Sequence, residues 1–200
     1  IAHTLAGKPN YNVESGEVIL NGESLLSKDP YERSLNGLFL AFQYPIELPG
    51  VTNASYLKQI VNAHRKSRKE TPIDAGEFLK ILKEKSKLLD IPMDMHSRFV
   101  NAGFSGGEKK KNEVLQMDLL NPSLIIMDET DSGLDVDALK TTAEAINKLR
   151  NDERSFIIIT HYLRLLEYIE PDYVHVFQNG SVIETGDKTL ASRIDQEGYS

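Results

Sequence analysis

The chain has 200 residues, of which 40% are hydrophobic and 26% charged, as in one large domain or a domain with a subdomain. Its net charge of −7 argues against non-specific binding to nucleic acid or to an anionic membrane, and the absence of cysteine excludes disulfides and thiolate chemistry. No apolar run approaches the roughly 20 residues of a membrane span, and the first ten residues lack the features of a secretory signal, so we expect a soluble intracellular protein without membrane insertion.

The first half of the chain predicts two short strands followed by two helices. Residues 17–22 form a β-rich run that ends in Asn-Gly, a dipeptide typical of hairpin turns, and residues 37–43 ("GLFLAFQ") form an apolar run of strand length. Apolar residues then recur at helical spacing in 54–64 and again in 75–89. Because only a polar loop separates these two patterns, we expect residues 53–99 to form an all-helical insertion.

The second half predicts a parallel β-sheet. Three continuous apolar runs rich in β-branched residues occupy 123–128, 155–160 and 173–177. Runs of this kind are typical of strands that are buried on both faces of a parallel sheet. Helical patterns separate them, at 136–149 and 162–169. The order β-α-β-α-β predicts an α/β, doubly wound core built from 1–52 and 100–200, with 53–99 as a helical subdomain.

A glycine turn precedes the helical pattern that leads to the first of these runs. Gly106 and Gly107 would leave the backbone N–H groups of a helix N-terminus open to an anion, with the Ser105 hydroxyl as a further donor. An ordinary helix cap explains this tripeptide equally well and is the better interpretation of it alone. The three lysines at 109–111 fit a solvated helix face better than a nucleic-acid patch, because the protein is acidic.

Carboxylates and a histidine follow two of the predicted strands. Asp128 and Glu129 end the run "LIIMDE", at the sheet edge where parallel α/β proteins bind ligands. One carboxylate there can hold Mg²⁺ through water, and its neighbour can polarise an attacking water. His161 ends the next run at the same edge. Taken singly, acidic residues often only begin a loop and a lone histidine is more often structural.

Together these segments resemble the ATP-binding cassette (ABC) ATPase family. The resemblance rests on "FSGGE", "LIIMDE", "SGLD" and "IIITH" at their observed separations, and on Gln43, which matches the Q-loop of that family. Longer blocks, such as "FQYPIELPGV" and "SGGEKKKNE", resemble the members that serve the SUF iron–sulfur cluster assembly machinery. The resemblance runs from about Ile1 to Ser200. It implies an ABC nucleotide-binding domain with a mostly parallel sheet core and an inserted helical subdomain.

In this family two subunits sandwich two ATP molecules, so that each site is built from both chains. The resemblance implies that Ser105, Gly106 and Gly107 bind the γ-phosphate of the nucleotide held by the opposite subunit. Asp135, in "SGLD", would link the two sites across the dimer. The partners implied are therefore a second copy of the chain in an ATP-dependent dimer and SufB- and SufD-like scaffold proteins, with no nucleic acid.

The catalytic roles also come from the resemblance. Asp128 would hold Mg²⁺ through its water shell, and Glu129 would be the general base that orients water for in-line attack. Gln43 would reach the metal and the attacking water, and His161 would contact the γ-phosphate. Phosphoryl transfer depends mostly on positioning and charge stabilisation, which suits polar groups at strand ends and helix starts. We expect a subunit that binds and hydrolyses ATP to energise cluster assembly.

One element of the family is missing from the sequence. The phosphate-binding pattern G-x-x-x-x-G-K-[ST] is absent, because the only Gly-Lys pair, Gly7-Lys8, is followed by Pro9 and has Ala2 in place of the first glycine. "IAHTLAG" resembles the helix that follows this loop, and the aromatic residue that stacks on adenine is missing too. With the downstream catalytic residues intact, we interpret the chain as a fragment rather than a natural truncation. We expect the chain alone to be inactive.

Two other functions fit parts of the sequence. One is the nucleotide-binding subunit of an ABC transporter, and the other is a truncated, non-catalytic interaction module. We expect the partner surface at 43–51, where prolines keep apolar residues out of regular structure, although Ile46 fits a core-capping position nearly as well. Bacterial cytosol and plastid stroma both host SUF machinery, and the Lys- and Asn-rich sequence favours a plastid.

Overall fold

A three-stranded parallel sheet forms the centre of the molecule. The computed structural model describes residues 1–130, 135–161 and 163–197. The sheet has the order β3-β6-β7, with bounds Leu38–Ala41, Leu124–Asp128 and Ser155–Ile159. Both neighbouring pairs are parallel. The continuous apolar runs at 123–128 and 155–160 therefore form adjacent parallel strands, as the sequence predicts.

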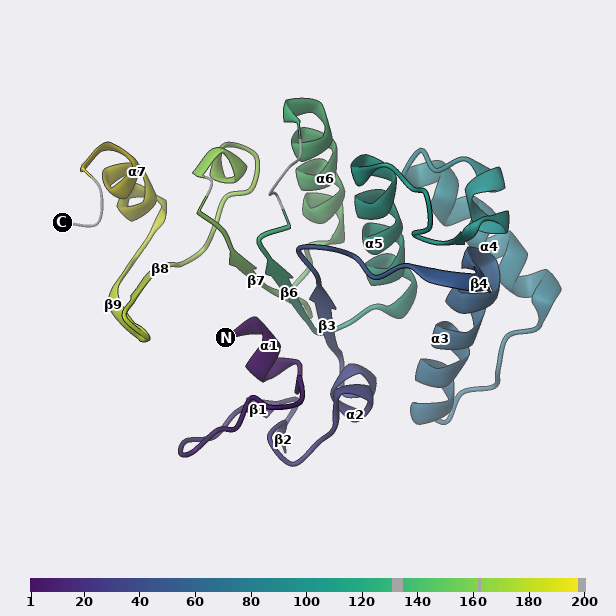
Figure 1. Cartoon of the computed structure of the whole chain (residues 1–200), viewed down its shortest axis with the longest axis horizontal. Coiled ribbons are helices and arrows are strands. Elements are labelled where there is room, and N and C mark those ends of the chain that lie inside the picture. The colour runs from purple at the N-terminus through teal and green to yellow at the C-terminus, as the bar shows by residue number, and fades with distance from the viewer. Residues whose placement is uncertain (131–134, 162, 198–200) are drawn as a thin grey trace.

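Helices cover both faces of this sheet (Figure 1). Ile125 and Met127 of β6 pack in one core cluster with residues of α5 (Gly106–Leu120) and α6 (Val136–Leu149). Ile126, which points to the opposite face, packs with Ala2 of the short helix α1 (Ala2–Leu5). The alternation follows from the two-residue period of a strand and explains why the four consecutive residues of β6 from Leu124 to Met127 are all apolar.

A hairpin and a short helix precede the sheet. Strands β1 (Ile19–Leu20) and β2 (Glu23–Ser24) pair antiparallel around Asn21-Gly22, both of which have positive φ. This confirms the Asn-Gly turn predicted from the sequence. Helix α2 (Pro30–Leu35) follows, and the Asp29 side chain caps it by accepting the N–H of Glu32.

A helical region lies at one end of the sheet. It contains α3 (Asn53–Ser67), α4 (Ala75–Leu88) and the 3₁₀ helix η1 (Met93–Ser97). The buried apolar side chains of these elements, among them Leu57 and Phe78, form one core cluster with Leu115 and Leu120 of α5. The division at 53–99 remains our assignment, because this core extends into α5.

A short strand pair joins the two ends of the helical region. Strands β4 (Leu48–Thr52) and β5 (Phe99–Val100) are antiparallel, and Thr52 lies opposite Phe99. The expectation that 43–51 stays out of regular structure is therefore wrong for its second half. The pairing is irregular between Leu48 and Thr52, where Pro49 and Gly50 interrupt the ladder.

The C-terminal part differs from the sequence-based prediction. The run at 173–177 forms β8 (Val174–Gln178), which pairs antiparallel with β9 (Ser181–Gly186) instead of joining the parallel sheet. The two-residue turn Asn179-Gly180, with positive φ at both residues, explains this hairpin. Within the predicted helix at 162–169 the described residues form only a 3₁₀ helix, η2 (Leu163–Glu167), before α7 (Lys188–Glu197) ends the described chain. Among the described helices, none has the length and apolar character needed to cross a bilayer.

A buried histidine links three elements of the helical region. His96 of η1 is 3% exposed, and its Nδ1 lies 3.2 Å from the amide nitrogen of Asn53 in α3. Because that nitrogen is a donor, Nδ1 accepts, and Nε2 carries the proton that it donates to the Ser86 hydroxyl in α4, 2.8 Å away. Burial lowers the pKa of His96, so the folded protein holds this imidazole neutral.

This arrangement predicts that the protein loses stability as the pH falls from 7.5 to 5.5. In the unfolded chain His96 takes up a proton near pH 6.5, whereas the folded state resists protonation, so acid favours unfolding. Melting temperatures across this range should fall less steeply for His96→Gln than for the wild type. The exposed His175 provides a control, since His175→Gln should leave the slope unchanged. Equal slopes in all three proteins would contradict the prediction.

Candidate active site

Glu129 lies at the carboxyl end of the central strand in a constrained backbone conformation. It follows Asp128, the last residue of β6, and has a φ of 48°. Its N–H donates to the carbonyl of Ile159 in β7 at 2.9 Å, which fixes its position at the sheet edge. A residue other than glycine, asparagine or aspartate is uncommon at positive φ, and such strain is often found at functional positions.

Two side chains from neighbouring strand ends contact the Glu129 carboxylate. The Gln43 amide nitrogen donates to Oε2 at 3.0 Å, and Nδ1 of His161 lies 3.6 Å from Oε1. Gln43 comes two residues after β3, and His161 two residues after β7. The structure thus brings together the three residues that the sequence predicts as catalytic, one from each strand of the sheet.

Asp128 and Gln43 have oxygens that suit a hard cation. The half-buried Asp128 carboxylate makes no hydrogen bond or ion pair with any described residue, and neither does the Gln43 amide oxygen. No three acidic or histidine side chains of the described residues form a cluster that would hold a metal alone. The donor set fits Mg²⁺, which binds few protein oxygens and keeps water or phosphate oxygens for the rest.

The Ser-Gly-Gly turn forms the N-terminus of α5. Ser105 is the helix cap: its hydroxyl accepts the N–H of Glu108, and the Glu108 carboxylate accepts the N–H of Ser105. The cap predicted from the sequence is therefore present. A Cβ atom at Gly106 or Gly107 would meet no atom of the described residues within 4 Å, and neither glycine has positive φ. Packing within the chain thus does not explain why these two residues are glycines.

Asp135 has a similar local role at the start of α6. Its side chain accepts the N–H of Ala138 at 2.8 Å and so caps the helix. The residues before it in "SGLD", 132–134, lie outside the described residues. No hydrogen bond between described side chains joins Asp135 or the Ser-Gly-Gly turn to Gln43 or Glu129. In a single chain, the predicted dimer-bridging residues and the predicted catalytic residues are separate groups.

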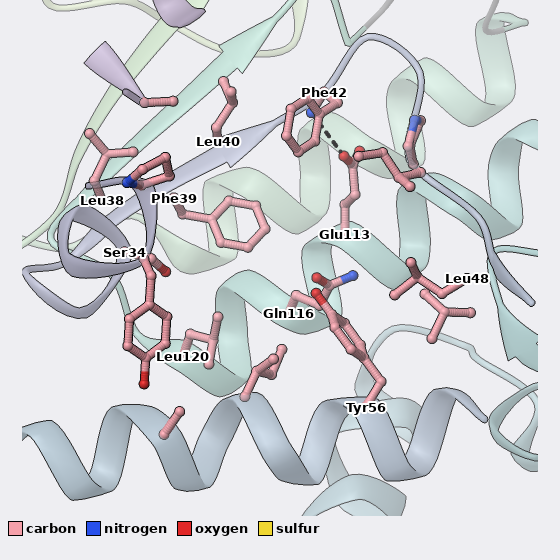
Figure 2. A pocket seen from close by; sticks show the side chains of 18 of the residues that line it. Ser34, Leu38, Phe39, Leu40, Phe42, Leu48, Tyr56, Glu113, Gln116 and Leu120 are labelled. Carbon is pink, nitrogen blue, oxygen red and sulfur yellow. Dashed lines mark hydrogen bonds between the residues drawn. The ribbon is translucent and has the colours of Figure 1, made fainter. Parts of the chain in front are cut away.

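A cavity of about 380 Å³ lies beneath the segment that follows Gln43. Figure 2 shows its apolar walls, which come from β3, α3, α5 and the chain around Leu48. Burial raises the pKa of Tyr56, one of the side chains in its wall. Glu113 and Gln116 of α5 supply polar groups to the lining. Sequence reasoning missed this cavity, because its walls come from segments far apart in the chain.

Lys110 departs from the prediction of a solvated lysine face. Lys109 and Lys111 are half-buried and pair with Glu47 and Asp90, whereas Lys110 is 5% exposed and pairs with Glu113 at 2.8 Å. The (i, i+3) spacing of a lysine and a glutamate is the signal in the sequence, but such pairs are usually exposed. Only the fold reveals that this pair is buried.

Curated proteins are similar to the chain over its whole length, although no family model matches it. An Escherichia coli K12 protein described as "Probable ATP-dependent transporter SufC" is 49% identical over 199 residues, which cover 100% of this chain and 80% of that protein. A Trieres chinensis protein described as "Probable ATP-dependent transporter ycf16" is 52% identical over 195 residues, or 98% of this chain and 78% of that protein.

A solved structure has the same fold. A dimeric ATP-binding cassette in a post-hydrolysis state, bound to ADP and phosphate, superimposes with a TM-score of 0.70. The superposition covers 87% of this chain and 74% of that chain at 17% sequence identity. At that identity the likeness shows the fold alone, and it agrees with the parallel sheet and flanking helices described above.

Proposed function

The chain belongs to the ABC ATPase family, in its SufC and ycf16 group, and we propose that it serves to hydrolyse ATP and so energise iron–sulfur cluster assembly on a SufB–SufD-type scaffold. The observation that carries this proposal is the Glu129 carboxylate, held between Gln43 and His161 at the carboxyl edge of the sheet. A carboxylate fixed on both oxygens, in a backbone conformation that favours neither strand nor helix, suits a base that must hold one geometry.

We assign the steps of hydrolysis to these side chains. Glu129 accepts a proton from the attacking water and orients it for in-line attack on the γ-phosphorus, while the bond from that phosphorus to the bridging oxygen of the leaving ADP breaks. Gln43 keeps the carboxylate in place and directs its amide oxygen to the metal and the water, and His161 donates to the γ-phosphate. Mg²⁺, held by Asp128 through water and by Gln43, would neutralise charge on the phosphate oxygens.

The remaining predicted residues act across a dimer in this proposal. Ser105, Gly106 and Gly107 would bind the γ-phosphate held by the opposite subunit, and Asp135 would connect the two sites. The open space above both glycines supports an approach from outside the chain, since backbone N–H groups at a helix N-terminus attract phosphate. We place the protein in the cytosol or the plastid stroma, and the Lys- and Asn-rich sequence favours the plastid.

Hydrolysis is the first test of the proposal. The assay uses residues 1–200 joined behind a segment that carries the pattern G-x-x-x-x-G-K-[ST], referred to below as the loop-bearing protein. We expect it to release phosphate from ATP in the presence of Mg²⁺. A loop-bearing protein that folds and dimerises but does not hydrolyse ATP would favour the non-catalytic interaction module.

The segment 43–51, here called the Q-loop segment, is our candidate for the scaffold-binding surface. Tyr44 is 78% exposed and Ile46 is 61% exposed, so Ile46 does not cap the core as one interpretation of the sequence had it. Val51 is also exposed, and Leu48 is half-buried above the cavity. Exposed aromatic and aliphatic side chains beside an apolar cavity are typical of binding anchors and their pockets.

We predict that Tyr44→Asp together with Ile46→Asp weakens binding to a purified SufB–SufD complex. Loss of an aromatic anchor typically costs about 2 kcal/mol, or roughly 30-fold in affinity. The melting temperature should not change, because both side chains are exposed. Biolayer interferometry with the loop-bearing protein measures the affinity.

A matched control lies on the other side of the molecule. Tyr173 and Ile183, near and in the β8–β9 hairpin, are 74% and 53% exposed, and changing both to Asp should leave scaffold affinity unaltered. Equal affinity of the two double variants would place the interface elsewhere. Binding to an ABC transporter membrane domain, with none to SufB–SufD, would favour the transporter alternative.

A further inference from the structure

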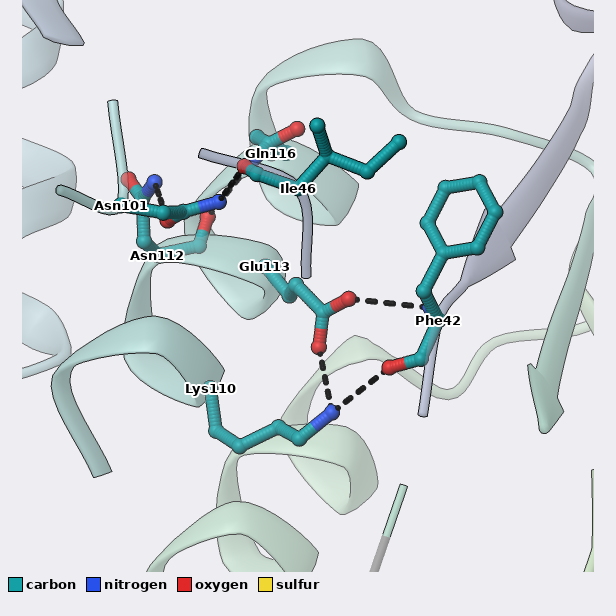
Figure 3. Close-up of polar contacts among 7 residues, drawn as sticks. All are labelled: Phe42, Ile46, Asn101, Lys110, Asn112, Glu113 and Gln116. Carbon is teal, nitrogen blue, oxygen red and sulfur yellow. Dashed lines mark hydrogen bonds and ion pairs between the residues drawn. The ribbon is translucent and has the colours of Figure 1, made fainter. Parts of the chain in front are cut away.

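Two charged side chains of α5 lie buried beside the start of the Q-loop segment. Lys110 and Glu113 are each 5% exposed, and their Nζ and Oε2 atoms are 2.8 Å apart. Figure 3 shows both side chains directed from α5 toward Phe42. Burial raises the pKa of the Glu113 carboxyl, and the charge of Lys110 opposes that shift.

The pair binds both backbone groups of Phe42. The Phe42 N–H donates to Oε1 of Glu113 at 3.1 Å, and Nζ of Lys110 donates to the Phe42 carbonyl at 3.0 Å. Backbone groups just beyond a strand usually bond to a neighbouring strand or to water. Here a carboxylate and an ammonium hold them instead, and such charge-assisted hydrogen bonds are roughly twice as strong as neutral ones.

Phe42 stands directly before the proposed catalytic amide. Strand β3 ends at Ala41, so the Lys110–Glu113 pair sets the direction in which the chain leaves the sheet. The next residue, Gln43, donates to Glu129 at 3.0 Å. A continuous series of contacts therefore leads from α5 through Phe42 and Gln43 to the proposed base.

A second contact holds the chain four residues further on. The Asn101 side chain donates to the carbonyl of Ile46 at 2.8 Å, and Asn112 of α5 donates to Asn101 at 3.0 Å (Figure 3). Asn101 and Asn112 are both buried. Helix α5 thus secures both ends of 42–46, directly at Phe42 and through Asn101 at Ile46.

The same helix begins with the Ser-Gly-Gly turn at 105–107. We propose that Lys110 and Glu113 are positioning residues that fix the Gln43 amide against Glu129 and make that geometry depend on the position of α5. This inference rests on the proposed ATPase function. A displacement of the Ser-Gly-Gly turn along or about the helix axis changes where Phe42 is held, and with it the alignment of Gln43.

A purely structural role makes a different prediction. A buried ion pair often stabilises a protein no more than an apolar pair of similar size, whereas removing one partner leaves a costly unpaired charge. The variant Lys110→Met with Glu113→Gln removes both charges, keeps the side-chain volumes and leaves an oxygen for the Phe42 N–H. If the pair only stabilises the fold, this double variant should hydrolyse ATP at the normal rate once folded.

We expect this double variant of the loop-bearing protein to lose roughly 10- to 100-fold in kcat, because misplacing a catalytic group by about 1 Å costs up to 10²-fold. Its ATP affinity should stay within a few-fold of wild type, since neither residue contacts the proposed nucleotide-binding groups. Lys111→Met is the matched control. Lys111 is the next lysine on α5 and pairs with Asp90, away from the Q-loop segment.

A double-mutant cycle with Gln43→Ala provides a readout that a structural role would not change. If Lys110 and Glu113 act through Gln43, changing them in the Gln43→Ala background should cause no further loss of kcat. The inference would be overturned if the Lys110 and Glu113 changes reduced kcat by the same factor in the Gln43→Ala background as in the wild-type background. It would also be overturned if they left kcat unchanged in the wild-type background.

A milder variant covers the case in which the double variant does not fold. Glu113→Gln is isosteric and leaves one oxygen for two donors, so one of the two contacts is lost and kcat should fall by a smaller factor. The same cycle with Gln43→Ala then decides. Failure of the proposed function looks different: the loop-bearing protein without substitutions would then not hydrolyse ATP, or it would hydrolyse ATP at the same rate after Glu129→Gln.

Discussion

Replacing Glu129 with glutamine in the loop-bearing protein is expected to reduce ATP turnover by roughly 10²- to 10⁴-fold, the usual contribution of a general base. The amide has the same size and keeps one oxygen for the Gln43 amide, which lies 3.0 Å from the carboxylate in the wild type. It cannot accept a proton from water at neutral pH. ATP affinity, measured by calorimetry, should therefore remain within a few-fold while phosphate release nearly stops.

Two further variants make this result specific. Asp128→Asn should weaken Mg²⁺-dependent ATP binding as well as turnover, because the change removes charge from the proposed metal ligand. Glu184→Gln, which changes an exposed carboxylate on β9, should alter neither quantity. Turnover of Glu129→Gln within a few-fold of wild type would show that Glu129 is not the base.

The polypeptide of residues 1–200 alone is expected to bind ATP at least 10³-fold more weakly than the loop-bearing protein. A loss of this size corresponds to the free energy of about three charge-assisted hydrogen bonds to the phosphates. Its sequence contains no G-x-x-x-x-G-K-[ST] pattern to surround the phosphates with backbone N–H groups and a lysine. In our proposal Asp128 and Gln43 would provide metal ligands, but neither supplies a cation for the phosphates. Calorimetry with Mg-ATP checks this difference.

The comparison requires that both proteins share one fold. Circular dichroism and the melting temperature of residues 1–200 should show a cooperative, helix-containing structure. Micromolar ATP affinity of residues 1–200 would contradict the prediction. It would mean that other groups of this chain replace the phosphate-binding loop.

The sequence predicts a strand of the central sheet correctly only where an apolar run also pairs with the neighbouring strand that we expected. The runs at 123–128 and 155–160 become β6 and β7, since each is long enough, apolar enough and preceded by a helix. The run at 173–177 has the same character, yet Asn179-Gly180 folds it back onto β9. An apolar run of five residues specifies a strand but not its neighbour, and here the turn after it decides the pairing.

In the candidate site, too, some features follow from the sequence pattern and others depend on contacts between distant parts of the chain. The grouping of Gln43, Glu129 and His161 follows from strand ends that meet at one sheet edge, which a sequence can indicate. The contact between Lys110 and the Phe42 carbonyl joins residues 68 positions apart. Helical spacing tells which side chains share a face, but it gives no information on what lies opposite that face.

The pairing of Thr52 with Phe99 also bears on how the chain folds. The pairing of strands β3 and β6 brings residues into contact that are far apart in the sequence, such as Gly37 and Ser123, which are 86 positions apart. Closing so long a loop is slow and entropically costly. Helices α3, α4 and α5 share one core cluster between Leu57 and Leu120. If this unit condenses first, β4 and the start of β6 are already its neighbours. The loop that remains to be closed when β3 pairs with β6 is then much shorter than the 86-residue separation. The entropic cost of forming the central sheet falls accordingly.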